Sequence, residues 1–174
     1  MNLAYFLFVL VAFVPTGFSQ KAETMTIKLY FHNGKYNPDQ DDCTKVFPVT
    51  RKIPKTAAVA TSALVELFKG PTDEEAAQQY SAFAPSETTG ILKSVKVRDG
   101  AAYVNFTGKL FDHMGYLTSS CGGGFFSMVG ATLRQFPTIK KVYYAVEGNT
   151  NDFYEWVQIG ECPYGKKICA ASNF

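Results

Sequence analysis

The sequence predicts an α+β fold, in which a small mixed or antiparallel sheet is covered by two main helices. Three observations predict it: short segments with alternating apolar residues, two segments with apolar residues at helical spacing, and an Asp99-Gly100 turn between two strand-like runs. The expected order is strand, strand, helix, hairpin, helix, strand. The hairpin requires at least one antiparallel pair. Two helices that cover one face of a sheet are the simplest packing for this order of elements.

Two strands are expected at the start of the domain. Apolar and polar residues alternate from Thr26 to Phe31, which is the period-2 pattern of a half-buried strand. The segment from Lys45 to Ile53 is also expected to be extended. Pro48 favours an edge or irregular position for it, because proline has no N–H to give to a sheet.

The first main helix is expected to follow Thr56, which is placed as its N-cap. Gly70 and Pro71 then form a typical helix stop. Thr72 and Glu75 have the spacing of a capping box, which predicts a short second helix through about residue 79. The apolar face of the first helix is expected to consist of Ala60, Ala63, Leu64, Leu67 and Phe68.

The clearest local signal is the hairpin of Leu92 to Val97 and Ala101 to Phe106. Asp99-Gly100 tolerates the positive φ angles that a two-residue turn requires. Gly122 to Gly124 then lead into the second main helix, and Lys141 to Glu147 is the last expected strand. That helix is expected to pack through Phe125 or Phe126, Val129, Leu133 and Phe136.

Residues 1–19 have the pattern of a signal peptide. Leu3 to Val14 is an uncharged apolar run, too short to span a bilayer. Gly17 and Ser19 supply the small side chains that a signal peptidase needs, so cleavage is expected between Ser19 and Gln20. No Lys or Arg precedes the apolar run, which departs from the usual pattern, and a buried N-terminal strand or helix is the alternative.

Residues 20–174 are expected to form a single domain, because this length is sufficient for one buried core. The formal net charge is +2, with acidic and basic residues mixed. Without a basic stripe, nucleic acid is not an expected partner. No later apolar run has the length of a membrane span, so the mature chain is not expected to cross a membrane.

The mature chain has four cysteines: Cys43, Cys121, Cys162 and Cys169. An even number in an exported chain predicts disulfides, and four cysteines allow three pairings. Cys162 and Cys169 are the most economical local pair, because they close a short loop. The alternative, a zinc site, needs paired short spacings that these cysteines lack, and no metal or cofactor is expected.

Few residues suggest catalysis. A Cys–His nucleophilic site needs Cys43 or Cys121 to be free and close to His32 or His113, and a disulfide would remove the nucleophile. The aspartates between Asp39 and Asp42 lack the glycine and glutamate positions of an EF-hand loop. The three glycines before the second helix lack the Lys-Ser/Thr of a P-loop.

Two features have both a structural and a functional interpretation. Asn105-Phe106-Thr107 is a glycosylation sequon, although it lies inside an expected strand. Aromatic residues near the C-terminus are expected either to add a strand or to pack across the sheet; alternatively, they form an exposed platform for sugar rings. The aromatic residues concerned are Tyr143, Phe153, Tyr154 and Trp156.

Three segments together indicate a family. They read AAVATSALVELFKGP followed by TDEE, from Ala57; ILKSVKVRDGAAYVNF, from Ile91 to Phe106; and GGGFFSMVGATLRQFPTIKKVYYAVEGN, from Gly122 to Asn149. In this order and spacing they resemble the GerMN domain of sporulation and spore-germination proteins. The resemblance covers about residues 26–149 and leaves a cysteine-containing C-terminal extension, residues 150–174. It implies an α+β domain on the outer side of a membrane, similar to ring-building modules of envelope assemblies, with no catalytic residues.

The leading hypothesis is therefore an exported, non-catalytic module that binds or assembles with a protein at the cell envelope. Many members of the family are lipoproteins with a cysteine after the signal, whereas this chain has Gln20 there, so a released periplasmic, cell-surface or secreted protein is expected. One alternative is a glycan- or peptidoglycan-binding module that uses the C-terminal aromatic residues. The other alternative is a secreted hydrolase with an unrecognised site.

Overall fold

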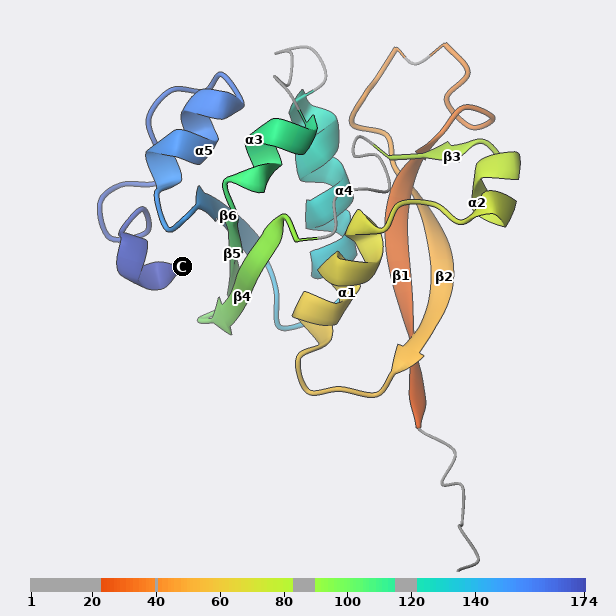
Figure 1. Ribbon diagram of the computed structural model, residues 1–174, viewed down its shortest axis with the longest axis horizontal. Helices are drawn as coiled ribbons and strands as arrows, with labels where there is room; N and C mark the ends of the chain where they lie inside the picture. Colours follow the sequence, from red (N-terminus) through yellow and green to blue (C-terminus); the bar gives the residue numbers. More distant parts are fainter. Residues whose placement is uncertain (1–22, 40, 83–89, 115–121) are drawn as a thin grey trace, which may run out of the picture.

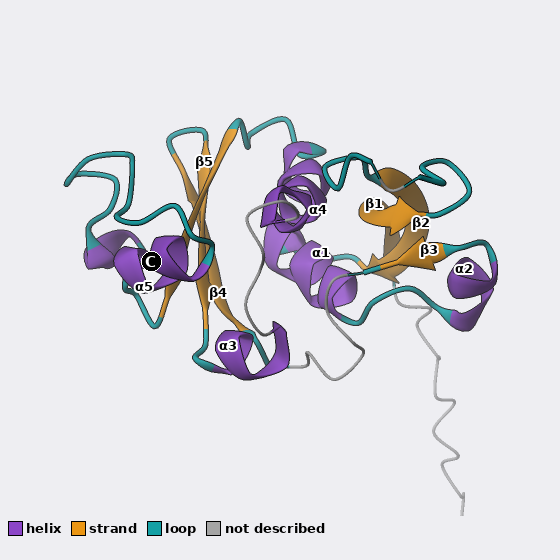
Figure 2. Ribbon diagram, turned by 90° about the horizontal axis from the view of Figure 1, so that it is seen from above, coloured by secondary structure: helices purple, strands orange, loops and turns teal. Residues whose placement is uncertain are grey.

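The computed structural model describes residues 23–39, 41–82, 90–114 and 122–174. Two small sheets enclose two helices, as the view from above in Figure 2 shows. The α+β class is confirmed, but the strands are divided between two sheets rather than gathered in one. The expected signal peptide, with its cleavage site at Ser19 and Gln20, lies outside the described residues.

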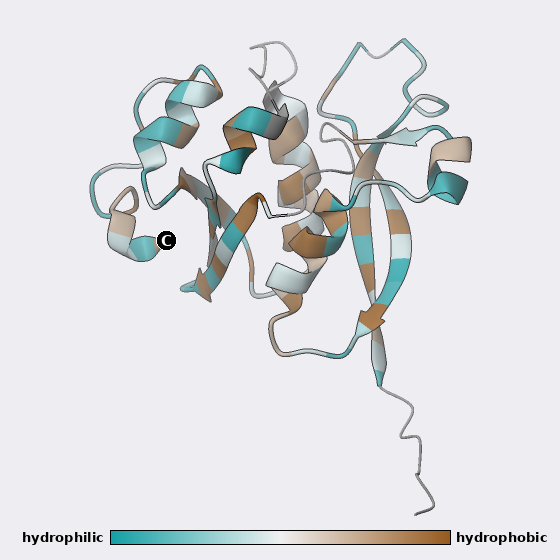
Figure 3. Ribbon diagram, in the orientation of Figure 1, coloured by the Kyte–Doolittle hydropathy of each residue, from teal (hydrophilic) through white to brown (hydrophobic). Residues whose placement is uncertain are grey.

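The first sheet has the order β2-β1-β3 and is antiparallel throughout. The central strand, β1, alternates buried and more exposed residues, as the sequence predicted. Pro48 lies in β2, which is an edge strand of this sheet, also as predicted. The alternation is visible in the colouring of both long strands in Figure 3. The strands are β1 (Thr24–Asn33), β2 (Phe47–Pro54) and β3 (Tyr80–Ser81).

The second sheet has the order β4-β5-β6. Asp99 and Gly100 join the first two strands with φ angles of 50° and 76°, which confirms the hairpin. The third strand runs parallel to β5, because a helix carries the chain back between them. The strands are β4 (Leu92–Arg98), β5 (Ala101–Phe106) and β6 (Lys141–Val146).

Two helices, α1 (Val59–Phe68) and α4 (Gly122–Arg134), contact both sheets and fill the space between them (Figure 1). The other helices are short: α2 (Asp73–Ala77), α3 (Lys109–Met114), α5 (Thr150–Trp156) and the 3₁₀ helix η1 (Ala171–Asn173). Of the helices in the described ranges, none is long and apolar enough to cross a bilayer.

Of the two helix caps predicted from the sequence, one is correct and one is wrong. Thr72 and Glu75 form the predicted capping box at the start of α2. Thr56 is not the N-cap of α1, because that helix begins two residues later, after Ala58. The Thr56 hydroxyl instead accepts a hydrogen bond from the Ala58 N–H at 3.1 Å, within the turn that precedes the helix.

The aromatic tail forms a helix rather than a strand. Asn149 caps α5, because its side chain accepts a hydrogen bond from the Asn151 N–H at 3.0 Å. The helix packs against β6, and Phe153 stacks on Phe106 with ring centroids 5.8 Å apart. This helix is therefore part of the main core, although the sequence had placed it in an extension.

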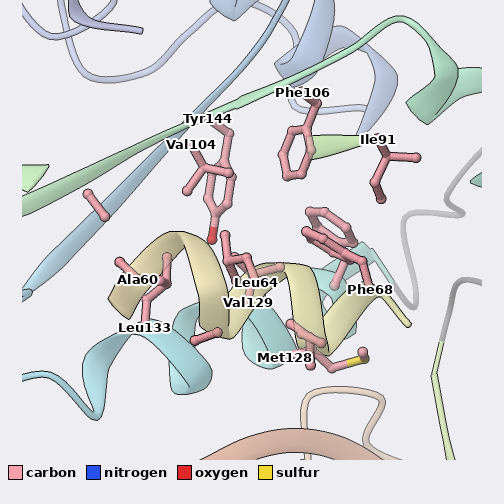
Figure 4. Packing of buried hydrophobic residues seen from close by; sticks show 14 of the residues in the cluster. Ala60, Leu64, Phe68, Ile91, Val104, Phe106, Met128, Val129, Leu133 and Tyr144 are labelled. Carbon is pink, nitrogen blue, oxygen red and sulfur yellow. The ribbon is translucent and has the colours of Figure 1, made fainter. Parts of the chain in front are cut away.

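The main core lies between the two sheets. Figure 4 shows Val104, Phe106 and Tyr144 of the second sheet facing Leu64 of α1 and Val129 of α4. A smaller cluster forms on the opposite face of the second sheet. Its members are Ala101, Tyr103, Tyr143, Ala145 and Phe174, with Ile168 packed against them.

This second cluster depends on residues 158–174, which we call the cap. The cap contains a disulfide between Cys162 and Cys169, whose Cα atoms are 6.1 Å apart. It folds back beside the second sheet, where η1 ends at the C-terminal marker in Figure 1. Both faces of the second sheet are thus in contact with other parts of the chain.

Candidate functional site: an aromatic groove beside the cap

The four aromatic residues considered as a sugar platform are buried. Tyr143, Phe153, Tyr154 and Trp156 expose between 0 and 6% of their surface. Phe153, Tyr154 and Trp156 lie on α5, which turns them into the main core, where Phe153 contacts the rings of Tyr144 and Phe125. Tyr143 lies on β6 and is buried in the smaller cluster on the other face of the second sheet. An exposed stacking platform made by these four residues is therefore wrong.

A groove of about 370 Å³ lies where α4, β6, α5 and the cap meet, and we call it the aromatic groove. Its floor is formed by Phe126 of α4, Val142 and Tyr144 of β6, and Tyr154 of α5. Its rim includes Arg134 and two cap residues, Ile159 and Tyr164.

Two large apolar side chains of the cap are exposed at the aromatic groove. Ile159 is 53% exposed and Tyr164 is 47% exposed. The Tyr164 ring is held at its inner edge by Tyr143, with centroids 4.9 Å apart, and by Tyr154 at 5.9 Å. A ring fixed on one side and exposed on the other offers contact area at a low cost in conformational entropy.

Two polar groups face this apolar surface. The Tyr154 hydroxyl is buried, beside the Tyr144 main chain and the Tyr164 side chain. Burial raises the pKa of both Tyr154 and Tyr144, so their hydroxyls stay protonated and can donate hydrogen bonds. The Arg134 guanidinium lies over Gly130, where a Cβ atom would approach its nitrogens to 2.7 Å. The glycine therefore leaves room for this arginine beside the groove.

Among the described residues, the cysteines and histidines do not form a nucleophilic site. Cys43 is disulfide-bonded, like Cys162 and Cys169, and Cys121 lies outside the described residues. Burial lowers the pKa of the His32 imidazole, and a main-chain hydrogen bond involving Lys45 opposes that shift. The His113 side chain is not among the parts of the chain that the structure describes. Within the described ranges, no group of three or more acidic, cysteine or histidine residues could hold a metal ion.

Other residues considered from the sequence have local structural roles. Asp42 accepts hydrogen bonds from the Thr44 N–H and hydroxyl, and Asp41 pairs with Lys45 at 3.4 Å. A Cβ atom on Gly123 would lie 3.0 Å from the Thr44 side chain, so the glycine allows α4 to begin close to that loop.

The sequon asparagine is also structural. Asn105 is 5% exposed, and its side-chain amide oxygen, Oδ1, accepts a hydrogen bond from the Gly148 N–H at 2.9 Å. Attaching a glycan would require removing this side chain from the folded core. In the folded protein Asn105 is therefore not accessible as a modification site.

The residues that define the aromatic groove could not be predicted from the sequence. Arg134 lies on α4, Ile159 and Tyr164 lie in the cap, and none of the three belongs to a short motif. The one available signal is the occurrence of large apolar residues, Ile159 and Tyr164 among them, in the C-terminal segment. Their exposure can be recognised only from the fold.

Comparisons with known proteins give a family. A family model described as sporulation and spore germination matches residues 28–152. Among solved structures, the first GerMN domain of the sporulation protein GerM from Bacillus subtilis is 25% identical. It has a TM-score of 0.51 and the match covers 71% of this chain and 84% of that one. The tandem GerMN domains of the same protein are 26% identical, with a TM-score of 0.52, covering 72% of this chain and 40% of that one. A comparison with curated protein sequences gave no match.

Proposed function

This chain belongs to the sporulation and spore germination family of GerMN domains, and we propose that it is a non-catalytic docking module that binds another protein at the cell envelope. The observation that carries the proposal is the aromatic groove, in which the exposed side chains of Ile159 and Tyr164 lie beside Arg134.

The chemistry of the aromatic groove favours a protein segment as its occupant. An apolar side chain would cover Ile159 and Tyr164, and a carboxylate would pair with Arg134 at the rim. Aromatic and arginine residues are enriched in the energetically important centres of protein interfaces. A sugar ligand is less favoured, because the aromatic rings that could stack on it are mostly turned into the core.

The architecture of a relative supports a protein partner. In GerM from Bacillus subtilis, two GerMN domains occur in tandem in one chain. A domain of this kind thus occurs next to another protein domain in that protein. We infer that the present chain presents its groove to a separate protein.

The proposed compartment is outside the cytoplasm, either the periplasm or the cell surface. The expected signal peptide and the disulfides at Cys43 and Cys162–Cys169 favour an oxidising environment. Fractionation of expressing cells followed by N-terminal sequencing tests this directly. We expect an exported protein that begins at Gln20, and an uncleaved cytoplasmic protein would contradict export.

Site-specific crosslinking tests the docking proposal. A photoreactive phenylalanine replaces Tyr164 in the groove or, as a matched control, Tyr36, which is 56% exposed and rests on Phe47 with centroids 5.2 Å apart. We expect one protein partner to be captured at position 164 and not at position 36. The same adduct should disappear when Arg134→Glu or Ile159→Ser is added.

Purified partner then gives an affinity. Tyr164→Ala should weaken binding by at least about tenfold, whereas Tyr36→Ala should change it less than about twofold. Equal effects at the two tyrosines would overturn the proposal. Binding to cell-wall fragments that is lost in Tyr164→Ala, without any protein adduct, would instead support the glycan alternative.

A further inference from the structure

We propose that a cleft at the turn between β4 and β5 binds a phosphate-bearing anion. The cleft has a volume of about 560 Å³ and lies between this turn, the start of β6 and the cap. It is separate from the aromatic groove, because the two sites share no lining residue. We call it the basic cleft.

The strand register places the basic residues on one face. Arg98 of β4 lies opposite Ala101 of β5, which in turn pairs with Lys141 of β6. The next row on the same face contains Tyr103 and Tyr143, which belong to the smaller cluster. The cleft therefore has cations at its edge and an apolar, aromatic floor.

Four cations and one carboxylate line the basic cleft: Arg98, Lys140, Lys141 and Lys167 against Asp99. This local excess of three positive charges is larger than the formal charge of +2 carried by the whole chain. In the part of the chain that the structure describes, no ion pair joins any of these cations to a carboxylate. Their mutual repulsion would be relieved by a bound anion.

The main chain and Tyr103 hold these groups in place before any ligand binds. The Arg98 guanidinium lies 4.8 Å from the centroid of the Tyr103 ring and donates a hydrogen bond to the Asn173 side chain. The N–H groups of Lys140 and Lys141 both donate to the Gly100 carbonyl, at 2.8 and 3.2 Å. The backbones that carry the cations are thus fixed to the turn, which lowers the entropy cost of binding.

The cap completes the basic cleft. Lys167, Ile168 and Asn173 line it, and all three lie beyond residue 152, where the family match ends. Ile168 packs against the cluster that contains Tyr103 and Tyr143, and Asn173 donates hydrogen bonds to the Lys167 and Ile168 carbonyls at 2.8 and 2.7 Å. The site is thus a property of this chain's cap rather than of the matched family domain alone.

A phosphate fits this arrangement better than a single carboxylate. It carries up to two negative charges and three acceptor oxygens on one centre, so it can pair with several cations at once. Lysine ammonium groups bind phosphate as point charges, and arginine adds directed hydrogen bonds. The volume leaves room for the group that bears the phosphate, which can be a soluble polyphosphate or a lipid headgroup.

Binding of defined probes to the disulfide-intact protein tests the proposal. Calorimetry with sodium tripolyphosphate and cosedimentation with phosphatidylglycerol vesicles distinguish the two sources, with phosphatidylcholine vesicles as the neutral reference. We expect at least one of the two anionic probes to bind, with an affinity that falls as ionic strength rises. Amide shifts in NMR spectra should be largest near Ala101 and Tyr103.

A charge-matched pair of variants separates the site from general electrostatics. Lys140→Gln/Lys141→Gln removes two cations from the basic cleft, and Lys28→Gln/Lys52→Gln removes two exposed cations from one face of the first sheet. We expect at least about tenfold weaker binding in the first variant and less than about twofold in the second. Circular dichroism melting curves establish that both are folded.

Several results would overturn the proposal. These are equal losses in the two double variants, no binding of either anionic probe at millimolar concentration, or tighter binding of a poly-glutamate peptide than of tripolyphosphate. The last result would assign the basic cleft to an acidic protein segment. Tyr164 does not line the basic cleft, but its ring contacts Tyr143, which does. Tripolyphosphate binding by Tyr164→Ala is therefore measured beside partner capture, so that loss of docking and loss of anion binding are distinguished.

Discussion

The main core and the cap are stabilised in different ways. The core joins both sheets and four helices through buried side chains that are far apart in the sequence. Phe106 alone contacts the rings of Phe68, Phe125, Tyr144 and Phe153 at centroid distances of 5.7 to 6.4 Å. In the cap only Asn173 and Phe174 are buried, and one disulfide closes a short loop.

This difference indicates a division of tasks. A core held by many distributed contacts can maintain the fold, whereas a cap held by a few local links can change without disturbing it. Both proposed binding surfaces include cap residues: Tyr164 in the aromatic groove and Lys167 in the basic cleft. The cap is thus the part of the molecule in which binding and fold stability can be separated by mutation.

The largest expected effect is at the centre of the core. Phe106→Ala should lower the free energy of unfolding by about 3–5 kcal/mol, because it removes a fully buried ring and leaves a cavity among four others. Urea unfolding followed by circular dichroism measures it. Phe111→Ala is the control, since Phe111 is 37% exposed, and its cost should stay below about 1 kcal/mol. Similar losses in the two variants would show that the core is not the dominant source of stability.

Local signals in the sequence predicted much of this core. The Asp99-Gly100 turn determines the hairpin because both residues must adopt positive φ, and Thr72 with Glu75 determines the start of α2. Both signals act within four residues, so the rest of the fold cannot override them easily. The capping of α1 by Thr56 failed because a threonine can serve a turn just before a helix as well as the helix itself.

The distant pairings could not be predicted in this way. Alternating residues show that β1 and β5 are strands but do not specify their partners, so the division into two sheets was missed. The tail forms α5 because Asn149 caps it and β6 offers an apolar surface, and neither effect produces a periodic pattern in seven residues. The basic cleft was missed for the same reason, because Arg98, Lys140 and Lys167 come together only through the strand register and the folded-back cap.

Removing the disulfide tests whether the cap is a separate unit. Cys162→Ala/Cys169→Ala should destabilise the cap by about 2–3 kcal/mol, near the lower end of the range for disulfides, because the closed loop is short. Hydrogen exchange should become faster at the amides of Ile168 and Phe174, which donate to the Gly165 and Ala171 carbonyls. Amides of β5 should keep their protection. A parallel loss of protection in β5 would mean that cap and core unfold together.

A smaller effect is expected from the buried asparagine of the cap. Asn173→Ala removes the donors to the Lys167 and Ile168 carbonyls and the acceptor for Arg98. The expected loss is roughly 1–2 kcal/mol, again confined to the cap, because these groups can regain water when the cap opens. Fluorescence quenching by acrylamide should increase for the tyrosines, since Tyr103 and Tyr143 lie beneath the cap. Ser172→Ala, at an exposed neighbouring position, is the control and should leave quenching unchanged.

The smallest effect concerns the point where the core leads into α5. Glu147 forms an ion pair with Lys93 and accepts a hydrogen bond from the Gly108 N–H at 3.2 Å. The pKa of the Glu147 carboxyl lies below the ordinary 4.5, mainly because of the hydrogen bond from Lys93. A carboxyl group with a lowered pKa stabilises the fold above its unfolded pKa, and this contribution is lost as the pH falls through the folded pKa. Glu147→Gln should therefore reduce the decrease in melting temperature between pH 6 and pH 3.

A direct titration makes this last prediction independent of melting. The side-chain carboxyl carbon of Glu147, followed by NMR, should have its midpoint below 4.5. Lys93→Gln should raise that midpoint toward the ordinary value, because the largest cause of the shift has been removed. Since Glu147 is exposed, high salt should weaken the effect of Lys93 as well. If the midpoint stays low in Lys93→Gln, the lowered pKa of Glu147 is due to the hydrogen bond from the Gly108 N–H. The shift would then depend on the main chain of the fold rather than on a surface ion pair.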